Sequence, residues 1–166
     1  AARGADGIIL DLEDSIPLAE KPRARTLIRE AAGTVGAKGA DVTVRINRPW
    51  RDTMRDLDAA IYPEIKALLL PKVDSADHVR MIAEVVDELE AERGIAAGSV
   101  KFVAMVETAA AFFRAEEIAR SHPRVVALTL GSEDFALSAG IIPEAEALLY
   151  PKQQIVFGAR AAGILP

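Results

Sequence analysis

Hydrophobic residues along the chain fall into five short runs, and each run is followed by a segment in which they recur at helical spacing. Runs of about four to eight apolar residues bounded by turn signals predict strands that are buried on both faces, as in a parallel sheet. The five predicted strands cover residues 7–10, 42–46, 65–70, 100–106 and 125–130. The repeated alternation of strand and helix predicts right-handed βαβ crossovers and an α/β fold.

The helices are predicted from the same periodicity together with capping residues. They cover residues 19–32, 55–61, 75–94, 109–119, 133–139 and 144–162, and residues 1–4 resemble the tail of a further helix. Gly33 is predicted to end the first of these helices and Gly163 the last. In the first helix we interpret Arg23 and Arg25 as solvated surface charges.

Two architectures fit this alternation: an open doubly wound sheet and a (β/α)8 TIM barrel, which needs about 250 residues. Only five strands are predicted, so a barrel would be incomplete, with about five central β/α units. Two features favour it. The chain opens on a helix end, and no predicted strand is followed by a GxGxxG or GxxxxGK[ST] phosphate loop. We therefore predict a single domain over 1–166 that is an incomplete barrel, truncated at both ends.

Composition narrows the class of protein. Hydrophobic residues make up 51% and charged residues 27% of the chain, a profile typical of folded globular proteins. No apolar run approaches the roughly 20 residues that cross a bilayer, and no signal-peptide pattern is present, so we expect a cytoplasmic protein. Cysteine is absent, which excludes disulfides and thiol catalysis. A net charge of −5 disfavours nucleic acid and anionic membranes as partners.

The two histidines, His78 and His122, are far apart in sequence. We interpret both as surface residues, which leaves a Ser-His-Asp arrangement without support.

Polar residues follow all five predicted strands, at the sheet edge where α/β folds place their chemistry. Glu107 ends the strand over 100–106, and Asp134 follows the strand over 125–130. Carboxylates from two neighbouring strands can share one Mg²⁺, which prefers oxygen ligands. The alternative is that both acids serve as helix caps or first-turn acids, because a helix follows each of them. The other strand-end acids are Asp11, Glu13, Asp14 and Glu133.

Two basic residues also stand at strand ends. Arg45 is the more specific, because a guanidinium can hold a substrate carboxylate through two parallel hydrogen bonds. Its alternative role is an ion pair with Glu13 or Asp14. Lys72 could bind an acidic substrate or neutralise the acids, and we favour neutralisation.

Taken together and in order, the motifs along the chain resemble those of the citrate lyase beta-subunit-like family, within the HpcH/HpaI aldolase group. The motifs are GADGIILDLEDSI, EKPRAR, VRIN, LLLPKVDSA, VAMVETAAAF, VVALTLGSEDFA and ARAAGI. The resemblance implies a (β/α)8 barrel, Mg²⁺ dependence and cleavage or formation of a carbon–carbon bond beside a carbonyl. It also implies small-molecule substrates, often acyl-CoA esters of hydroxy acids such as citryl-CoA or malyl-CoA, with a 2-keto acid product.

By motif position, the resemblance assigns a role to several of these residues. Glu107 and Asp134 would be the metal ligands, with Glu107 also near the substrate. Arg45 would bind the substrate carboxylate and take part in catalysis. Glu13 and Asp14 would also be catalytic residues, lying beside the metal as outer-shell or water-binding groups.

The chain departs from the family pattern at both ends. The first strand unit of the family and its last two units have no counterpart here, so we expect a central segment that holds strands two to six of a barrel. Such a segment would be a fragment, or would complete its sheet with another chain. A neighbouring subunit can close the site in these relatives, which implies a homo-oligomer.

Three functions follow from these expectations. The first is a Mg²⁺-dependent lyase that cleaves a hydroxy-acyl-CoA to an acyl-CoA and a 2-keto acid. The second is a metal-dependent aldolase acting on free 2-keto acids without CoA. The third is a non-catalytic barrel subunit.

Overall fold

A computed structural model describes residues 4–166, so the helix tail predicted at the start of the chain falls largely outside the described residues. All five predicted strands are confirmed to within one residue at either end. They are β1 (Gly7–Asp11), β2 (Asp41–Arg45), β3 (Ile65–Leu70), β4 (Lys101–Val106) and β5 (Val125–Leu130).

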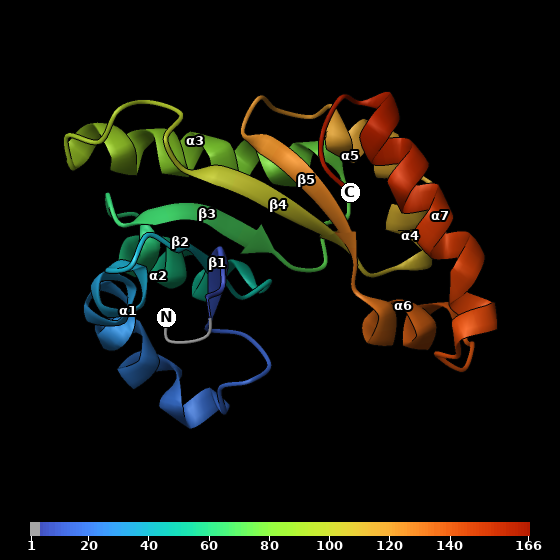
Figure 1. The fold of residues 1–166 in the computed structure, drawn as a ribbon, viewed down its shortest axis with the longest axis horizontal. Coiled ribbons are helices and arrows are strands. Elements are labelled where there is room, and N and C mark those ends of the chain that lie inside the picture. The colour runs from blue at the N-terminus through green and yellow to red at the C-terminus, as the bar shows by residue number, and fades with distance from the viewer. Residues whose placement is uncertain (1–3) are drawn as a thin grey trace. The chain divides into compact units, whose positions relative to one another are not determined.

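The sheet is open and parallel, with the strand order β1-β2-β3-β4-β5 (Figure 1). Each crossover therefore moves one strand along in the same direction, whereas a doubly wound sheet reverses direction part-way. This order supports the incomplete barrel and not the open doubly wound sheet. Leu165 continues the progression: its N–H donates to the Val126 carbonyl (2.9 Å), and its own carbonyl accepts from Leu128 N–H (3.0 Å). Residue 165 thus lies along β5, where the next strand of this progression would begin.

The helices depart from prediction mainly at their ends. Their bounds are Lys21–Gly36 for α1, Trp50–Ala60 for α2, Ala76–Glu92 for α3, Ala109–Phe112 for α4, Ala115–Ala119 for α5, Ser132–Ala139 for α6 and Ala145–Ala161 for α7, with a 3-10 turn at Leu18–Glu20. The predicted stop at Gly33 is wrong, because Gly33 does not take the positive φ that ends helices at glycine. The helix predicted over 109–119 is interrupted at residues 113–114.

The chain divides into two compact units. The first comprises the residues up to Leu69 together with Val85–Lys101, and the second comprises Leu70–Glu84 together with Phe102–Pro166. Buried side chains of the first unit include Val42, Val44, Ile46, Leu57 and Leu68, and those of the second include Phe102, Ala104, Val106, Ile118 and Leu128. The sheet edge is less covered than predicted, since Ile9 of β1 is 59% exposed.

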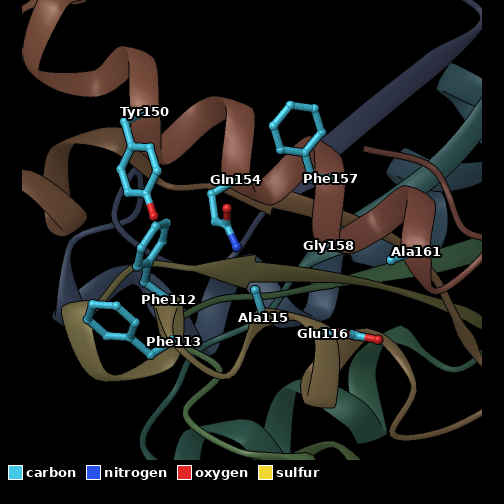
Figure 2. A pocket seen from close by; sticks show the side chains of 9 residues that line it. All are labelled: Phe112, Phe113, Ala115, Glu116, Tyr150, Gln154, Phe157, Gly158 and Ala161. Atoms are coloured by element: carbon cyan, nitrogen blue, oxygen red, sulfur yellow. The ribbon is translucent and has the colours of Figure 1, made fainter.

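None of the helices within residues 4–166 is both long and apolar enough to cross a membrane. The second unit carries a groove of about 290 Å³, lined by α4, α5 and α7. Figure 2 shows its aromatic wall, in which Tyr150 of α7 points towards Phe112 of α4, with ring centroids 5.9 Å apart. The strand-end acids are not among the residues that line this groove.

Candidate active site

In the second unit, three charged residues stand at the carboxyl ends of consecutive strands. Lys72 follows β3, Glu107 follows β4 directly, and Asp134 lies in the first turn of α6, just after β5. The Lys72 ammonium is 2.9 Å from Asp134 Oδ2, and the Lys72 backbone N–H donates to Glu107 Oε2 at 2.6 Å. One residue therefore contacts both acids predicted to hold a metal, and the expected neutralising role of Lys72 is confirmed for Asp134.

Glu107 is held in place by close packing. Its side chain is buried, and its carboxylate lies directly over Gly131. A Cβ atom at residue 131 would come within 2.1 Å of Glu107 Oε1, far inside any real contact distance. The glycine of the GSED motif is thus required so that this carboxylate can approach the backbone between β5 and α6.

The helices that follow Glu107 and Asp134, α4 and α6, pack against each other. Thr108 caps α4, with its Oγ1 accepting from Ala111 N–H at 3.1 Å. The Phe112 ring of α4 packs against the Phe135 ring of α6, with centroids 5.5 Å apart. The helix-cap alternative therefore applies only in part: Asp134 is a first-turn acid, whereas the residue that caps α4 is Thr108 and not Glu107.

The backbone of Lys72 is strained. Its φ of 49° is the only positive value at a non-glycine position among residues 4–166. A left-handed conformation costs an L-residue roughly 1–2 kcal/mol, and such strain concentrates at functional sites. At Lys72 this conformation accompanies the N–H contact to Glu107 and the ammonium contact to Asp134.

The donor chemistry of this cluster fits a hard divalent cation. Glu107 and Asp134 supply carboxylate oxygens, and the Lys72 ammonium shows that a positive charge is accommodated beside Asp134. Among the described residues, no group of three or more acids and histidines is arranged to hold a metal. Two carboxylates alone are nevertheless a common protein contribution to Mg²⁺, which keeps several waters or takes substrate oxygens.

The first unit holds the other predicted site residues. Asp11 and Arg45 are register partners at the ends of β1 and β2. Arg45 binds Asp11 through two parallel hydrogen bonds, Nε to Oδ1 at 2.8 Å and Nη2 to Oδ2 at 2.5 Å, and its Nη1 is 2.9 Å from Glu13 Oε2. The predicted alternative, an ion pair with Glu13, is thus present, and Asp11 is an additional partner. Asp14 is exposed.

These contacts shift the pKa values of both Asp11 and Arg45. Hydrogen bonding to Asp11 raises the pKa of Arg45 above its ordinary value, and the charges of Glu13 and Asp14 add to the effect. Burial alone would raise the pKa of Asp11, but hydrogen bonds from Arg45 and from neighbouring residues hold it well below its usual value. The pair is therefore fully ionised at neutral pH.

Sequence reasoning missed the lysine that supports this pair. The Lys21 ammonium donates to the Leu12 carbonyl (2.8 Å), the Glu13 carbonyl (2.7 Å) and Asn47 Oδ1 (2.7 Å). An ammonium group has three N–H donors, and all three are used here. Lys21 therefore ties the turn after β1 to the residues after β2.

A buried ion pair extends this support. Asp56 is fully buried and accepts from Asn47 N–H at 2.6 Å and from Arg25 Nε at 2.6 Å. The interpretation of Arg25 as a solvated charge is wrong, since its side chain is only 11% exposed. The spacing contained the signal, because Lys21 and Arg25 lie on the same helical stripe as the buried residues Ile28 and Ala32.

The interpretation of His78 as a surface residue is also wrong. His78 is buried in the first turn of α3, on the stripe that carries Ile82, and its backbone N–H donates to Ser75 Oγ at 3.2 Å. His122 is half-buried, and its Nδ1 accepts from Arg124 N–H at 3.2 Å. Both contacts are local in sequence, and His78 Nδ1 also lies 3.7 Å from Asp74 Oδ1.

Comparison with known proteins identifies the family. The sequence profile described as HpcH/HpaI aldolase/citrate lyase matches residues 1–165. The chain belongs to the HpcH/HpaI aldolase/citrate lyase family.

Several curated proteins are similar to this family member. It is 36% identical over 166 residues to the citrate lyase subunit beta of Leuconostoc mesenteroides subsp. cremoris, covering 97% of this chain and 54% of that protein. It is also 36% identical over 145 residues to the L-malyl-CoA/beta-methylmalyl-CoA lyase of Cereibacter sphaeroides, covering 85% of this chain and 45% of that protein. The chain thus spans about half the length of the curated relatives it matches.

Solved structures agree with the fold. The citrate lyase beta subunit of M. tuberculosis, complexed with oxaloacetate and magnesium, matches with a TM-score of 0.73 at 31% identity, covering 99% of this chain and 69% of that chain. Haloferax volcanii malate synthase matches with a TM-score of 0.84 at 19% identity, covering 96% of this chain and 51% of that chain, which shows the shared fold alone.

Proposed function

We propose that this family member is a magnesium-dependent carbon–carbon lyase. It would cleave a hydroxy-acyl-CoA of the citryl-CoA or malyl-CoA type into an acyl-CoA and a 2-keto acid. The observation that carries the proposal is the pair of carboxylates, Glu107 and Asp134, gathered around Lys72 at the ends of adjacent strands. The similarity to citrate lyase beta subunits and malyl-CoA lyases supports the reaction class.

Glu107 and Asp134 would hold the cation. When bound, Mg²⁺ supplies a Lewis acid that stabilises negative charge on a carbonyl oxygen by several kcal/mol. The two residues contribute differently. Glu107 is buried and fixed by the Lys72 N–H and by contact with Gly131, so it would set the position of the site. Asp134 is about one-third exposed, so it would adjust to the incoming ion.

Arg45 would bind the substrate carboxylate. The guanidinium of Arg45 donates two hydrogen bonds to Asp11, and its Nη1 lies 2.9 Å from Glu13 Oε2. The Arg45 side chain is 20% exposed, so an anionic ligand would approach the guanidinium at its exposed part. The bidentate contact with Asp11 would keep the guanidinium plane fixed while that ligand binds. Glu13 and Asp14 remain proposed as outer-shell or water-binding groups.

The proposed step is a retro-aldol-type cleavage. The substrate hydroxyl loses its proton, its carbon becomes the keto carbon, and the adjacent carbon–carbon bond breaks. The electron pair of that bond passes to the α-carbon of the acyl-CoA, which then takes up a proton. The residues of this chain contribute by holding the substrate in position, which can lower a barrier by several kcal/mol.

The test uses the full-length protein with Mg²⁺ and either citryl-CoA or malyl-CoA, with keto acid release as the readout. Glu107→Gln and Asp134→Asn should each lower turnover by about 100-fold, because each removes a charged ligand. Glu133→Gln is the matched control, since Glu133 is an exposed acid beside Asp134. Unchanged Mg²⁺ affinity and turnover in both ligand variants would contradict the proposal.

The choice of substrate separates the remaining functions. Cleavage of a free hydroxy-keto acid without CoA would favour the aldolase. A folded protein that binds no Mg²⁺ and turns over neither substrate would favour a non-catalytic subunit. We further propose a cytoplasmic homo-oligomer, to be tested by cell fractionation and light scattering.

A further inference from the structure

Lys72 contacts the two proposed metal ligands with different parts of the residue. Its backbone N–H donates to Glu107 Oε2 at 2.6 Å, and its ammonium lies 2.9 Å from Asp134 Oδ2. The first contact is made by the main chain, so a change of side chain can leave it intact. The second contact depends wholly on the ammonium. The two effects of Lys72 on this site can therefore be separated by substitution.

We propose that the Lys72 ammonium is a placeholder cation, meaning that it occupies Asp134 in the metal-free protein and competes with the metal for that carboxylate. The Lys72 backbone N–H would hold the Glu107 carboxylate in its metal-binding position throughout. The inference rests on the proposed metal site. A carboxylate oxygen that pairs with an ammonium group cannot also bind a divalent ion at full strength, because the two positive charges repel each other. Binding of the metal would therefore displace the ammonium from Asp134.

The exposure of the pair permits this exchange. The side chains of Lys72 and Asp134 are 33% and 35% exposed, so the ammonium can move from the carboxylate into water. Glu107, in contrast, is buried and keeps its N–H contact. The placeholder would neutralise Asp134 in the metal-free protein at a modest cost in metal affinity, because ion pairs as exposed as this one are weak.

The strained backbone supports a role beyond neutralisation. Charge balance alone requires a lysine at this distance from Asp134, but it does not require a left-handed residue. The φ of 49° coincides with the N–H contact to Glu107 and with the ammonium contact to Asp134. Strain of this kind persists where the surrounding structure imposes a geometry, as at ligand sites.

The experiment is a Mg²⁺ titration by calorimetry on the full-length protein, which needs no turnover. Lys72→Met removes the ammonium and keeps the backbone N–H, so we expect Mg²⁺ to bind about three- to fivefold more tightly. Lys72→Arg keeps a positive charge and should stay within about twofold of the parent. Lys152→Met is the matched control, because Lys152 is an exposed lysine on α7 and its loss changes the net charge equally.

The outcomes separate this inference from the proposed function. A parent protein that binds no Mg²⁺ contradicts the proposed function itself. If the parent binds Mg²⁺ and the Lys72→Met protein binds it equally or less tightly, the placeholder role is wrong. The same conclusion follows if Lys152→Met tightens binding as much. Lys72→Gln serves in place of the methionine variant if that variant does not fold, with circular dichroism as the check, and the same tightening is expected of it.

Discussion

Replacing Gly131 by alanine gives the sharpest test of the carboxylate pair. Gly131 has a φ of −81°, which an alanine backbone adopts without strain. The obstacle is therefore steric and comes from one side chain. The added Cβ would lie 2.1 Å from Glu107 Oε1, 2.5 Å from its Cγ and 2.7 Å from its Cδ.

The size of the disturbance follows from these distances. Ordinary van der Waals contact begins at 3.4 Å, so the Glu107 carboxylate must withdraw by about 1 Å or more. Glu107 is only 4% exposed, so it has little room to move, and its 2.6 Å contact with Lys72 N–H would be stretched or broken. A misplacement of about 1 Å can lower the rate by about 100-fold. We expect a loss of that order in turnover, together with weaker Mg²⁺ binding.

The assay compares Gly131→Ala with the parent in full-length protein, by calorimetric Mg²⁺ titration and by keto acid release. Gly158→Ala is the matched control. A Cβ at Gly158 in α7 would meet its nearest neighbour, Ala115 Cβ, at 3.7 Å, which is an ordinary contact. That variant should keep full activity and gain up to about 1 kcal/mol in stability from helix propensity. If Gly131→Ala matches the parent within about twofold in both measurements, Glu107 is not a ligand in the geometry described here.

Three further predictions concern stability. Glu90→Gln should lower the free energy of unfolding by about 1–3 kcal/mol in urea titrations. The buried Glu90 carboxylate accepts from Val100 N–H, and in glutamine one of its two acceptor oxygens is replaced by an NH2 donor. A loss below about 0.5 kcal/mol would contradict this. Asp56→Asn should cost about 1–3 kcal/mol, because it removes the buried charged acceptor of Arg25 Nε while Asp52 remains as a second partner, 2.9 Å from Arg25 Nη2. A thermal melt close to the parent's would refute this. The pKa of Asp11 is lower in the folded protein than its unfolded value of about 4. The ion pair with Arg45 therefore stabilises the fold fully above about pH 4, and this stability is lost as the pH falls towards the folded pKa. Asp11→Asn should flatten the acid side of the curve of stability against pH, and an unaltered slope would show that the ion pair does not contribute to stability.

The hydrophobic pattern was sufficient to predict the strands, because each buried strand is a run of consecutive apolar residues. Apolar runs such as 65–70 and 125–130 predicted the strand bounds without error. Helix ends were less predictable. Whether Gly33 ends a helix depends on its φ, and whether residues 113–114 interrupt one depends on packing, and neither is encoded in local composition.

Charged side chains were the main source of error. Arg25 and His78 were interpreted as surface residues, yet both are largely buried on the same stripes as apolar neighbours. Charge type alone suggested exposure, because an unpaired buried charge costs several kcal/mol. That cost is avoided for Arg25 by Asp56, which is 31 residues away in the chain. No local sequence pattern predicts an ion-pair partner at that separation.

The sequence by itself determined the alternation of strands and helices, the parallel sheet and the strand-end positions of Glu107 and Asp134, because these depend on the order of neighbouring residues. Only the tertiary structure decided that Lys72 contacts both acids and that Gly131 lies beneath one of them. The physical reason is distance along the chain. Lys72 and Glu107 are 35 residues apart, and their contact exists only once parallel strands bring their carboxyl ends to one edge.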